Sequence, residues 1–293
     1  MKTIKTYLWF DSDAVEVAQT YAGMFQGAQM GSPLIMRGTP QGDTAAVDLR
    51  LPGLDILAFS LSGYFKFNPA GSLFVSCRTK EEVDHLHRRL MEGGRELMPL
   101  GAYPFSPWYA WVEDKYGLSW QIILIEGTKS ELSVRPALMF SGVATGRAEE
   151  AMDFYASVFP GSEAIQKSHY EEGGAPDKRA KLAHGSMTIN GVPFILQDNG
   201  MPVDYTFNEA FSLMVLCFDQ AEIDRLWAAL SHVPEAEQCG WLKDKFGVSW
   251  QIVPHNLYDI LFTGTKEEIA RVTEAFMPMK KIDIAALEKA KRG

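Results

Sequence analysis

The chain repeats one segment almost unchanged near the end of each of two related stretches. DKYGLSWQ occupies residues 114–121 and DKFGVSWQ occupies residues 244–251, with six identities in eight positions at an offset of 130. Further matches at offsets of 134 and 140 relate the earlier parts of the two stretches. Because internal repetition at this scale marks a structural unit that occurs twice, we expect two tandem copies of one module.

Each copy has the pattern of a βαβββ module followed by a second, similar half. In the second copy, Asn190-Gly191 joins two segments of alternating character, residues 182–190 and 192–198, and is a strong hairpin signal. Helical periodicity returns in both copies after the next strand, at residues 79–91 and 220–230. Four related half-modules therefore predict an α+β fold built from paired βαβββ modules.

The repeat and the tail divide the chain into three parts. We expect a first domain at residues 1–130, a second at 131–256 and a C-terminal helical tail at 257–293. In the tail, Thr265 and Glu268 have the spacing of a capping box, which predicts the start of a helix.

Composition restricts the partners and the location of the protein. The net charge of −9 argues against nucleic acid as a partner, because binding phosphate backbones needs a basic surface. No apolar run approaches the length of a membrane span, and the N-terminal residues do not resemble a signal peptide. Three cysteines without metal-type spacing fit a reducing compartment. We therefore predict a cytoplasmic protein with no membrane and no nucleic-acid partner.

Alternation along the strands places polar side chains on one face of each sheet. We expect this face to be the concave side of a curved sheet, so that each copy forms a cup for a small, partly polar organic ligand. The candidate ligand-binding residues are Gln121, Gln251, His184, Ser186, Ser72, Ser212, Asn68, Asn208 and Trp108. The alternative is that the Gln and Ser pairs face solvent and that His184 is a hydrogen-bonded structural residue.

Two further features have their own interpretations. The repeated Asp-Lys-aromatic-Gly is typical of a tight turn, since Gly supplies a positive φ and Asp can bond nearby backbone. An aromatic and proline-rich insertion at residues 103–111, present only in the first copy, is either a lid over the first cup or the cover of an interface.

The repeats, the D-K-[FY]-G-x-S-W-Q segments and the tail PMKKIDIAALEKA resemble the PhnB-like family, also called 3-demethylubiquinone-9 3-methyltransferase-like. That family belongs to the vicinal oxygen chelate superfamily, with glyoxalase I, extradiol dioxygenases and bleomycin-resistance proteins. The resemblance covers nearly the whole chain and implies tandem glyoxalase/bleomycin-resistance/dioxygenase-like domains. Since single-copy relatives commonly pair, it also implies a monomer with an internal pseudo-dimer, or a homodimer.

The superfamily resemblance also implies a position for a divalent metal, held by His or Glu on the first and last strands of each half. Here the last-strand positions are Gln121 and Gln251, whose neutral amide oxygens are weaker ligands than carboxylates. His184 and Gln251 are the remaining metal candidates, which is fewer than the three protein ligands of a usual catalytic site. We therefore expect no catalytic metal and no other cofactor.

Three classes of function stay open. The leading hypothesis is a PhnB-like protein that binds a small organic ligand. The rival is an enzyme, either a metal-dependent lyase, isomerase or dioxygenase, or a methyltransferase as the family label suggests. The sequence has no Gly-rich strand–loop–helix for an adenosyl cofactor and no nucleophile–base pair. The third class is a structural or interaction module whose cups are filled by their own side chains.

Overall fold

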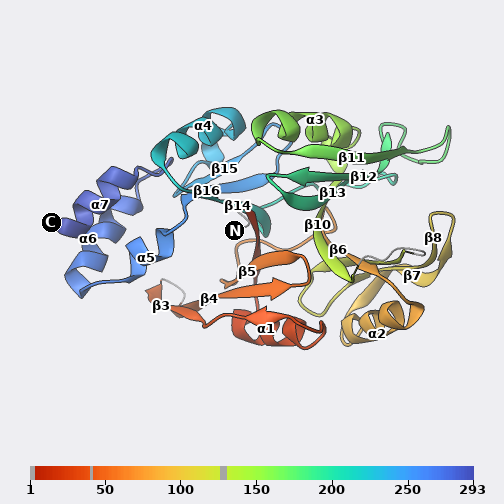
Figure 1. The fold of residues 1–293 in the computed structure, drawn as a ribbon, viewed down its shortest axis with the longest axis horizontal. Helices are drawn as coiled ribbons and strands as arrows, with labels where there is room; N and C mark the ends of the chain where they lie inside the picture. Colours follow the sequence, from red (N-terminus) through yellow and green to blue (C-terminus); the bar gives the residue numbers. More distant parts are fainter. Residues whose placement is uncertain (1–3, 40–41, 126–130) are drawn as a thin grey trace. The chain divides into compact units, whose positions relative to one another are not determined.

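The computed structural model describes residues 4–39, 42–125 and 131–293 and divides into two compact units (Figure 1). The central unit is Thr6–Phe211, and the terminal unit is Met1–Lys5 with Ser212–Gly293. These boundaries differ from those of the two sequence copies. The secondary structure is mixed α+β, as the sequence predicts.

Four strand–helix–strand half-modules follow one another along the chain. The elements of the first copy are β1 (Ile4–Phe10), α1 (Ala14–Ala22), β2 (Gln29–Met30), β3 (Leu34–Thr39), β4 (Gly42–Leu51), β5 (Leu54–Ser60), β6 (Gly71–Cys77), α2 (Lys80–Leu90), β7 (Arg95–Tyr103), β8 (Ser106–Glu113) and β9 (Ser119–Leu124). The elements of the second copy are β10 (Ser133–Phe140), η1 (Gly142–Ala144), α3 (Ala148–Val158), β11 (Glu163–His169), β12 (Leu182–Ile189), β13 (Val192–Asp198), β14 (Phe211–Cys217), α4 (Gln220–Leu230), η2 (Pro234–Ala236), β15 (Trp241–Lys243) and β16 (Ser249–Pro254). The tail contains α5 (Leu257–Phe262), α6 (Lys266–Phe276) and α7 (Ile284–Arg292).

One sheet of the central unit joins half-modules from different copies. Its order is β11-β12-β13-β10-β6-β9-β8-β7, and β10 and β6 are antiparallel neighbours with Ala137 opposite Ser72 (Figure 1). The expectation that each copy forms its own cup is therefore wrong for this sheet. The four half-modules resemble one another, so any of their first strands can pair with another, and only the tertiary structure selects the partner.

The remaining strands also pair within each unit. In the central unit, β1 and β5 are parallel and β5 is followed by β4, which pairs with both β2 and β3. In the terminal unit, β16 lies between β14 and β15, parallel to the first and antiparallel to the second. The hairpin between β12 and β13 turns at Asn190 and Gly191, with φ of 49° and 76°, which confirms the predicted turn.

The repeated Asp-Lys-aromatic-Gly segment is a tight turn, as predicted. Asp114 Oδ1 accepts hydrogen bonds from the backbone N–H groups of Tyr116 and Leu118, and Gly117 has a φ of 84°. Asp114 Oδ2 accepts the indole N–H of Trp120 at 2.8 Å, a contact that the turn pattern alone does not predict. The turn therefore fixes the start of β9 and the orientation of a fully buried tryptophan.

The second copy builds the same turn in the terminal unit. Asp244 Oδ1 accepts from the N–H groups of Phe246 and Val248, and Oδ2 accepts from the indole of Trp250 at 2.8 Å. Gly247 has a φ of 87°. The identity of Asp, Gly and Trp in both copies thus follows from one local geometry.

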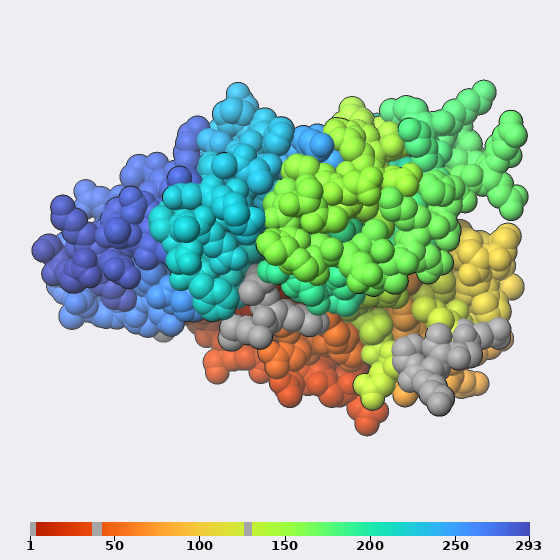
Figure 2. All heavy atoms as spheres, turned by 45° about the horizontal axis from the view of Figure 1, so that its top comes forward, coloured from red at the N-terminus to blue at the C-terminus, as the bar shows by residue number. Residues whose placement is uncertain are grey.

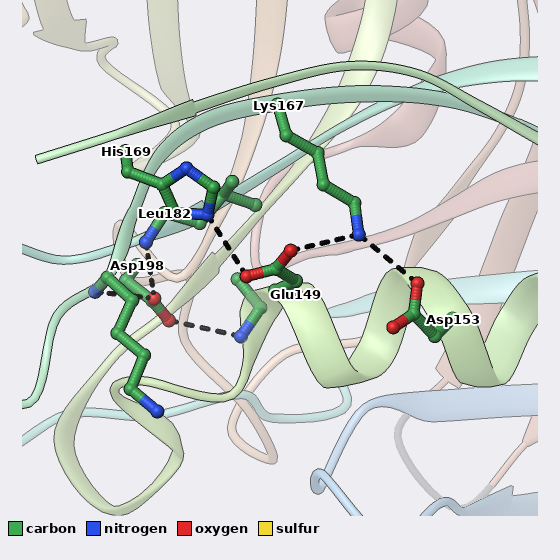
Figure 3. Close-up of polar contacts among 8 residues, drawn as sticks. Glu149, Asp153, Lys167, His169, Leu182 and Asp198 are labelled. Carbon is green, nitrogen blue, oxygen red and sulfur yellow. Dashed lines mark hydrogen bonds and ion pairs between the residues drawn. The ribbon is translucent and has the colours of Figure 1, made fainter.

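The start of α3 depends on a carboxylate from another element. The N-terminal residue before α3 provides no side-chain cap. Instead, Asp198 at the end of β13 accepts hydrogen bonds from the N–H groups of Gly146 and Ala148 with one oxygen, and of Lys181 and Leu182 with the other (Figure 3). Asp198 is 1% exposed, so this carboxylate joins the end of β13, the start of α3 and the start of β12.

The longest helix of the tail, α6, begins where the sequence predicts. Thr265 and Glu268 form a reciprocal capping box at the start of α6. The short helix α5 was not part of the sequence prediction, and its six residues are too few to give a periodic signal. Among the described residues, no helix combines the length and apolar character that crossing a membrane requires.

The loops before β6 and β14 bind each other reciprocally within the central unit. Asn68 donates its side-chain N–H to the carbonyl oxygen of Thr206, and Asn208 donates to that of Lys66. Each asparagine also accepts the N–H two residues ahead, so both side chains are occupied by structural contacts. Beside these loops, Gly71 lies directly against the ring of Phe211.

Replacing Gly71 with alanine should therefore destabilise the central unit. The added Cβ would lie well inside van der Waals distance of Phe211, and overpacking of this kind costs about 2 kcal/mol. Gly101→Ala in β7 is the matched control, because nothing lies within 4 Å of its Cβ position. Urea unfolding followed by circular dichroism measures both, and equal midpoints for the two variants would contradict the prediction.

Candidate functional site

The sheet that joins the two copies is strongly curved. Gln121 on β9 donates an amide N–H to Oε1 of Gln197 on β13 at 3.1 Å, although β6 and β10 lie between these strands. Side chains three strands apart meet only if the sheet bends toward their face. We call this concave face the central cup, lined by residues of β12, β13, β10, β6, β9 and β8.

A hydrogen-bonded polar network crosses the middle of the central cup. Besides Gln197, the Gln121 amide donates to Ser72 Oγ at 2.9 Å, and its oxygen accepts the hydroxyl of Tyr109 at 3.3 Å. Gln121 is 1% exposed and Ser72 is fully buried. The sequence places Gln121 and Ser72 on the inner face, as observed, whereas it does not single out Gln197 or Tyr109 for this network.

Apolar side chains form the floor on which this network rests. Phe74, Ala137 and Ile195 are buried together, and Ile123 packs against them while staying partly exposed. Ser186 on β12 lies opposite Ile195 on β13 and is buried. Part of the cup is therefore filled by the protein's own side chains, whereas Ile123 and Arg135 stay partly exposed.

A guanidinium lies on this floor. Arg135 on β10 donates through Nη2 to Ser76 Oγ, and its guanidinium carbon is 5.3 Å from the centroid of the Phe74 ring. Its Nε is buried without a hydrogen-bond partner, and within the described residues it forms no ion pair. Burial lowers the pKa of Arg135, which nevertheless remains a permanent cation. The sequence could have indicated Arg135 as a functional residue, because it is a charged residue within the otherwise apolar strand at 133–140.

The candidate histidine is a neighbour of this arginine. The His184 ring lies 5.6 Å from that of Phe74. Burial, and then the positive charge of Arg135, lower the pKa of His184 to about 4. The imidazole is therefore neutral at pH 7 and presents one donor and one acceptor to the central cup.

The aromatic insertion forms the β7–β8 hairpin, whose two faces have different surroundings. Trp108 lies against α2, where its indole donates to Asp84 at 2.7 Å and Lys80 lies 3.7 Å from its ring centroid. The structure thus places this ligand candidate on the face away from Gln121. Tyr109, the next residue, points to the cup and packs against Phe105 at the hairpin tip.

The other candidates lie outside the central cup. In the terminal unit, Gln251 donates to Ser212 Oγ at 3.1 Å, which reproduces the pairing of Gln121 with Ser72. His184 belongs to the central unit and Gln251 to the terminal unit, so the two metal candidates of the sequence are in different compact units. Asn68 and Asn208 hold loops together, as described above.

The donors of the central cup do not fit a divalent cation. Within residues 4–39, 42–125 and 131–293, no three His, Cys, Asp or Glu side chains gather as metal ligands do. The oxygens at the centre are amide and hydroxyl oxygens already engaged with each other, and a guanidinium lies beside them. Divalent metals in such sites prefer several carboxylate or imidazole ligands, and the centre of the cup does not provide such a set.

Comparison with known proteins shows the class of fold to which the paired βαβββ modules belong. The fold is that of the glyoxalase and dioxygenase type: glyoxalase I from Zea mays is 13% identical, covers 86% of this chain and 94% of its own, and has a TM-score of 0.55. The chain belongs to the 3-demethylubiquinone-9 3-methyltransferase family, whose model matches residues 2–123 and again 133–253. This confirms the predicted PhnB-like, tandem organisation.

A further similar structure covers less than half of this chain. A PhnB protein from Bacillus cereus is 35% identical over 41% of this chain and 98% of its own, with a TM-score of 0.38. A comparison with curated protein sequences finds no match.

Proposed function

We propose that the protein binds a small organic anion in the central cup, with Arg135 as the residue that contacts the negative charge. The observation that carries the proposal is a partly buried guanidinium without an acidic partner among the described residues. A buried charge that lacks a counter-ion is costly, and a bound anion would offset that cost. Charge-assisted hydrogen bonds from a guanidinium to a carboxylate or phosphate are also among the strongest in proteins.

The neighbours of Arg135 support an anion rather than a cation. His184 is neutral at pH 7 and can donate one hydrogen bond, and the Gln197 amide offers further polar contact. Ser76 already accepts from the guanidinium, which fixes its orientation over Phe74. A preorganised cation on an apolar floor suits a ligand that has one charged group and an apolar remainder.

An enzymatic function has less support. The family description names a methyltransferase, but the sequence lacks a Gly-rich strand–loop–helix that would hold an adenosyl cofactor. The structural-module alternative is favoured by the filled centre of the cup, yet it does not explain an arginine without an acidic partner. The absence of a cofactor, the cytoplasmic location and the choice between monomer and homodimer remain predictions from the sequence.

Arg135→Gln should lower anion affinity at least tenfold, because it removes the charge and its paired donors. The measurement is an NMR titration of the His184 imidazole with acetate, succinate and inorganic phosphate. A bound anion beside Arg135 should raise the pKa of His184 above its value of about 4, since added negative charge favours the imidazolium.

Two further variants test whether the anion response depends specifically on Arg135. Arg78→Gln is the matched control, because Arg78 is exposed and already paired with Glu82 at 2.7 Å, and it should leave the response unchanged. Arg135→Lys keeps the charge without the planar fork and should retain part of the affinity. If none of the three anions shifts the His184 pKa in the unmodified protein, the proposed function is rejected.

A further inference from the structure

The β7–β8 hairpin presents three aromatic rings beside the central cup. Tyr103 and Phe105 are stacked, with centroids 5.5 Å apart and planes 19° apart. Tyr109 meets both edge-on, at 5.6 Å from Tyr103 and 5.0 Å from Phe105. Tyr109 is buried, whereas Phe105 is 60% exposed, so the rings form a wall from solvent to the interior of the cup.

Strand register relates this aromatic wall to the arginine. Ser76, which accepts from the Arg135 guanidinium, is level with Ile123 on the neighbouring strand β9. Ile123 is in turn opposite Tyr109 on β8. Two inter-strand spacings, about 10 Å, therefore separate Ser76 from Tyr109. The side chain between them is the partly exposed, apolar Ile123.

We propose that the ligand is an aryl carboxylate, whose carboxylate binds Arg135 and whose ring lies on Ile123 against Tyr109 and Phe105. This inference rests on the proposed anion site and adds the class of ligand. The two inter-strand spacings between Ser76 and Tyr109, about 10 Å, are comparable to the length of one aromatic ring with its carboxylate and their contact distances. Aromatic contacts in stacked or edge-on geometry are stronger than burial of the same area of aliphatic surface, so the wall selects a planar ring.

The test uses the full chain and three probes of matched size: benzoate, cyclohexanecarboxylate and benzamide. Ligand-observed NMR titrations should give benzoate roughly fivefold higher affinity than cyclohexanecarboxylate, because only the planar ring gains the aromatic contacts. Benzamide keeps the ring and lacks the charge, so it should bind at least tenfold more weakly than benzoate.

Phe105→Ala should reduce the preference for benzoate over cyclohexanecarboxylate, because it removes one of the two rings that the ligand ring contacts. Because Phe105 is exposed, its replacement removes little core packing, and circular dichroism verifies that the variant is folded. Phe218→Ala, which removes another exposed phenylalanine at 56% exposure, is the matched control and should keep the preference.

The outcomes separate the two proposals. Equal affinity for the two carboxylates, or an unchanged preference in Phe105→Ala, overturns the aryl inference while the anion site stands. Binding that is absent for both carboxylates, or that does not depend on Arg135, overturns both.

Discussion

Asp198→Ala is expected to lower the free energy of unfolding of the central unit by about 4 kcal/mol, because it leaves four buried backbone donors without their acceptor. The carboxylate receives the N–H groups of Gly146 and Ala148 at 2.8 and 3.1 Å, and those of Lys181 and Leu182 at 3.0 and 2.9 Å. It also places negative charge at the start of α3, where the helix dipole favours it.

The matched control is Asp153→Ala, on α3, the helix whose start Asp198 caps. Asp153 forms an exposed ion pair with Lys167 at 3.2 Å (Figure 3), and such surface pairs contribute only about 0.5 kcal/mol. Asp198→Asn should fall between the two alanine variants, since one amide oxygen can still accept. Urea midpoints measured by circular dichroism decide the order, and equal losses for Asp198→Ala and Asp153→Ala would contradict our account of α3.

Asp114→Ala is expected to cost about 3 kcal/mol, the second-largest effect. Its Oδ2 accepts the Tyr21 hydroxyl at 2.6 Å and the Trp120 indole at 2.8 Å, while Oδ1 holds the turn. Asp114 is 6% exposed, so water cannot readily replace these four hydrogen bonds. Tryptophan fluorescence during unfolding reports directly on the loss of order around Trp120.

The control for Asp114 is Asp84→Ala, which also removes an indole acceptor. Within the described part of the chain, the hydrogen bond that Asp84 accepts comes from the Trp108 N–H, at 2.7 Å, and Asp84 is partly exposed, so the loss should stay near 1 kcal/mol. If Asp84→Ala and Asp114→Ala cost the same, the turn contacts of Asp114 contribute nothing measurable, and its identity in both copies would need another explanation.

Much of the local structure was predictable because its causes are local. The Asp-Lys-aromatic-Gly turn, the Asn190-Gly191 hairpin and the Thr265–Glu268 capping box depend on residues two to four positions apart. The inward direction of Gln121 follows from alternation in its strand. The two contacts that Asp198 makes with α3 lie some fifty residues away, and no short-range pattern indicates them.

In the space-filling view, segments of the two copies adjoin each other in the central unit (Figure 2). Orange and yellow residues of the first copy and green residues of the second pack side by side across it (Figure 2). The central cup takes Ser72 and Gln121 from the first copy and His184 and Gln197 from the second. Its composition therefore depends on which half-modules pair.

The sequence by itself determined that one α+β module is repeated and which residues of each strand share a face, because repetition and alternation are properties of neighbouring positions. The tertiary structure decided that β10 pairs with β6, which brings Arg135 to Phe74 and His184. The physical reason is that related half-modules offer equivalent strand edges, so their local patterns are satisfied by more than one pairing. The repeated segment fixed each turn and its tryptophan, while the choice of partner created the site.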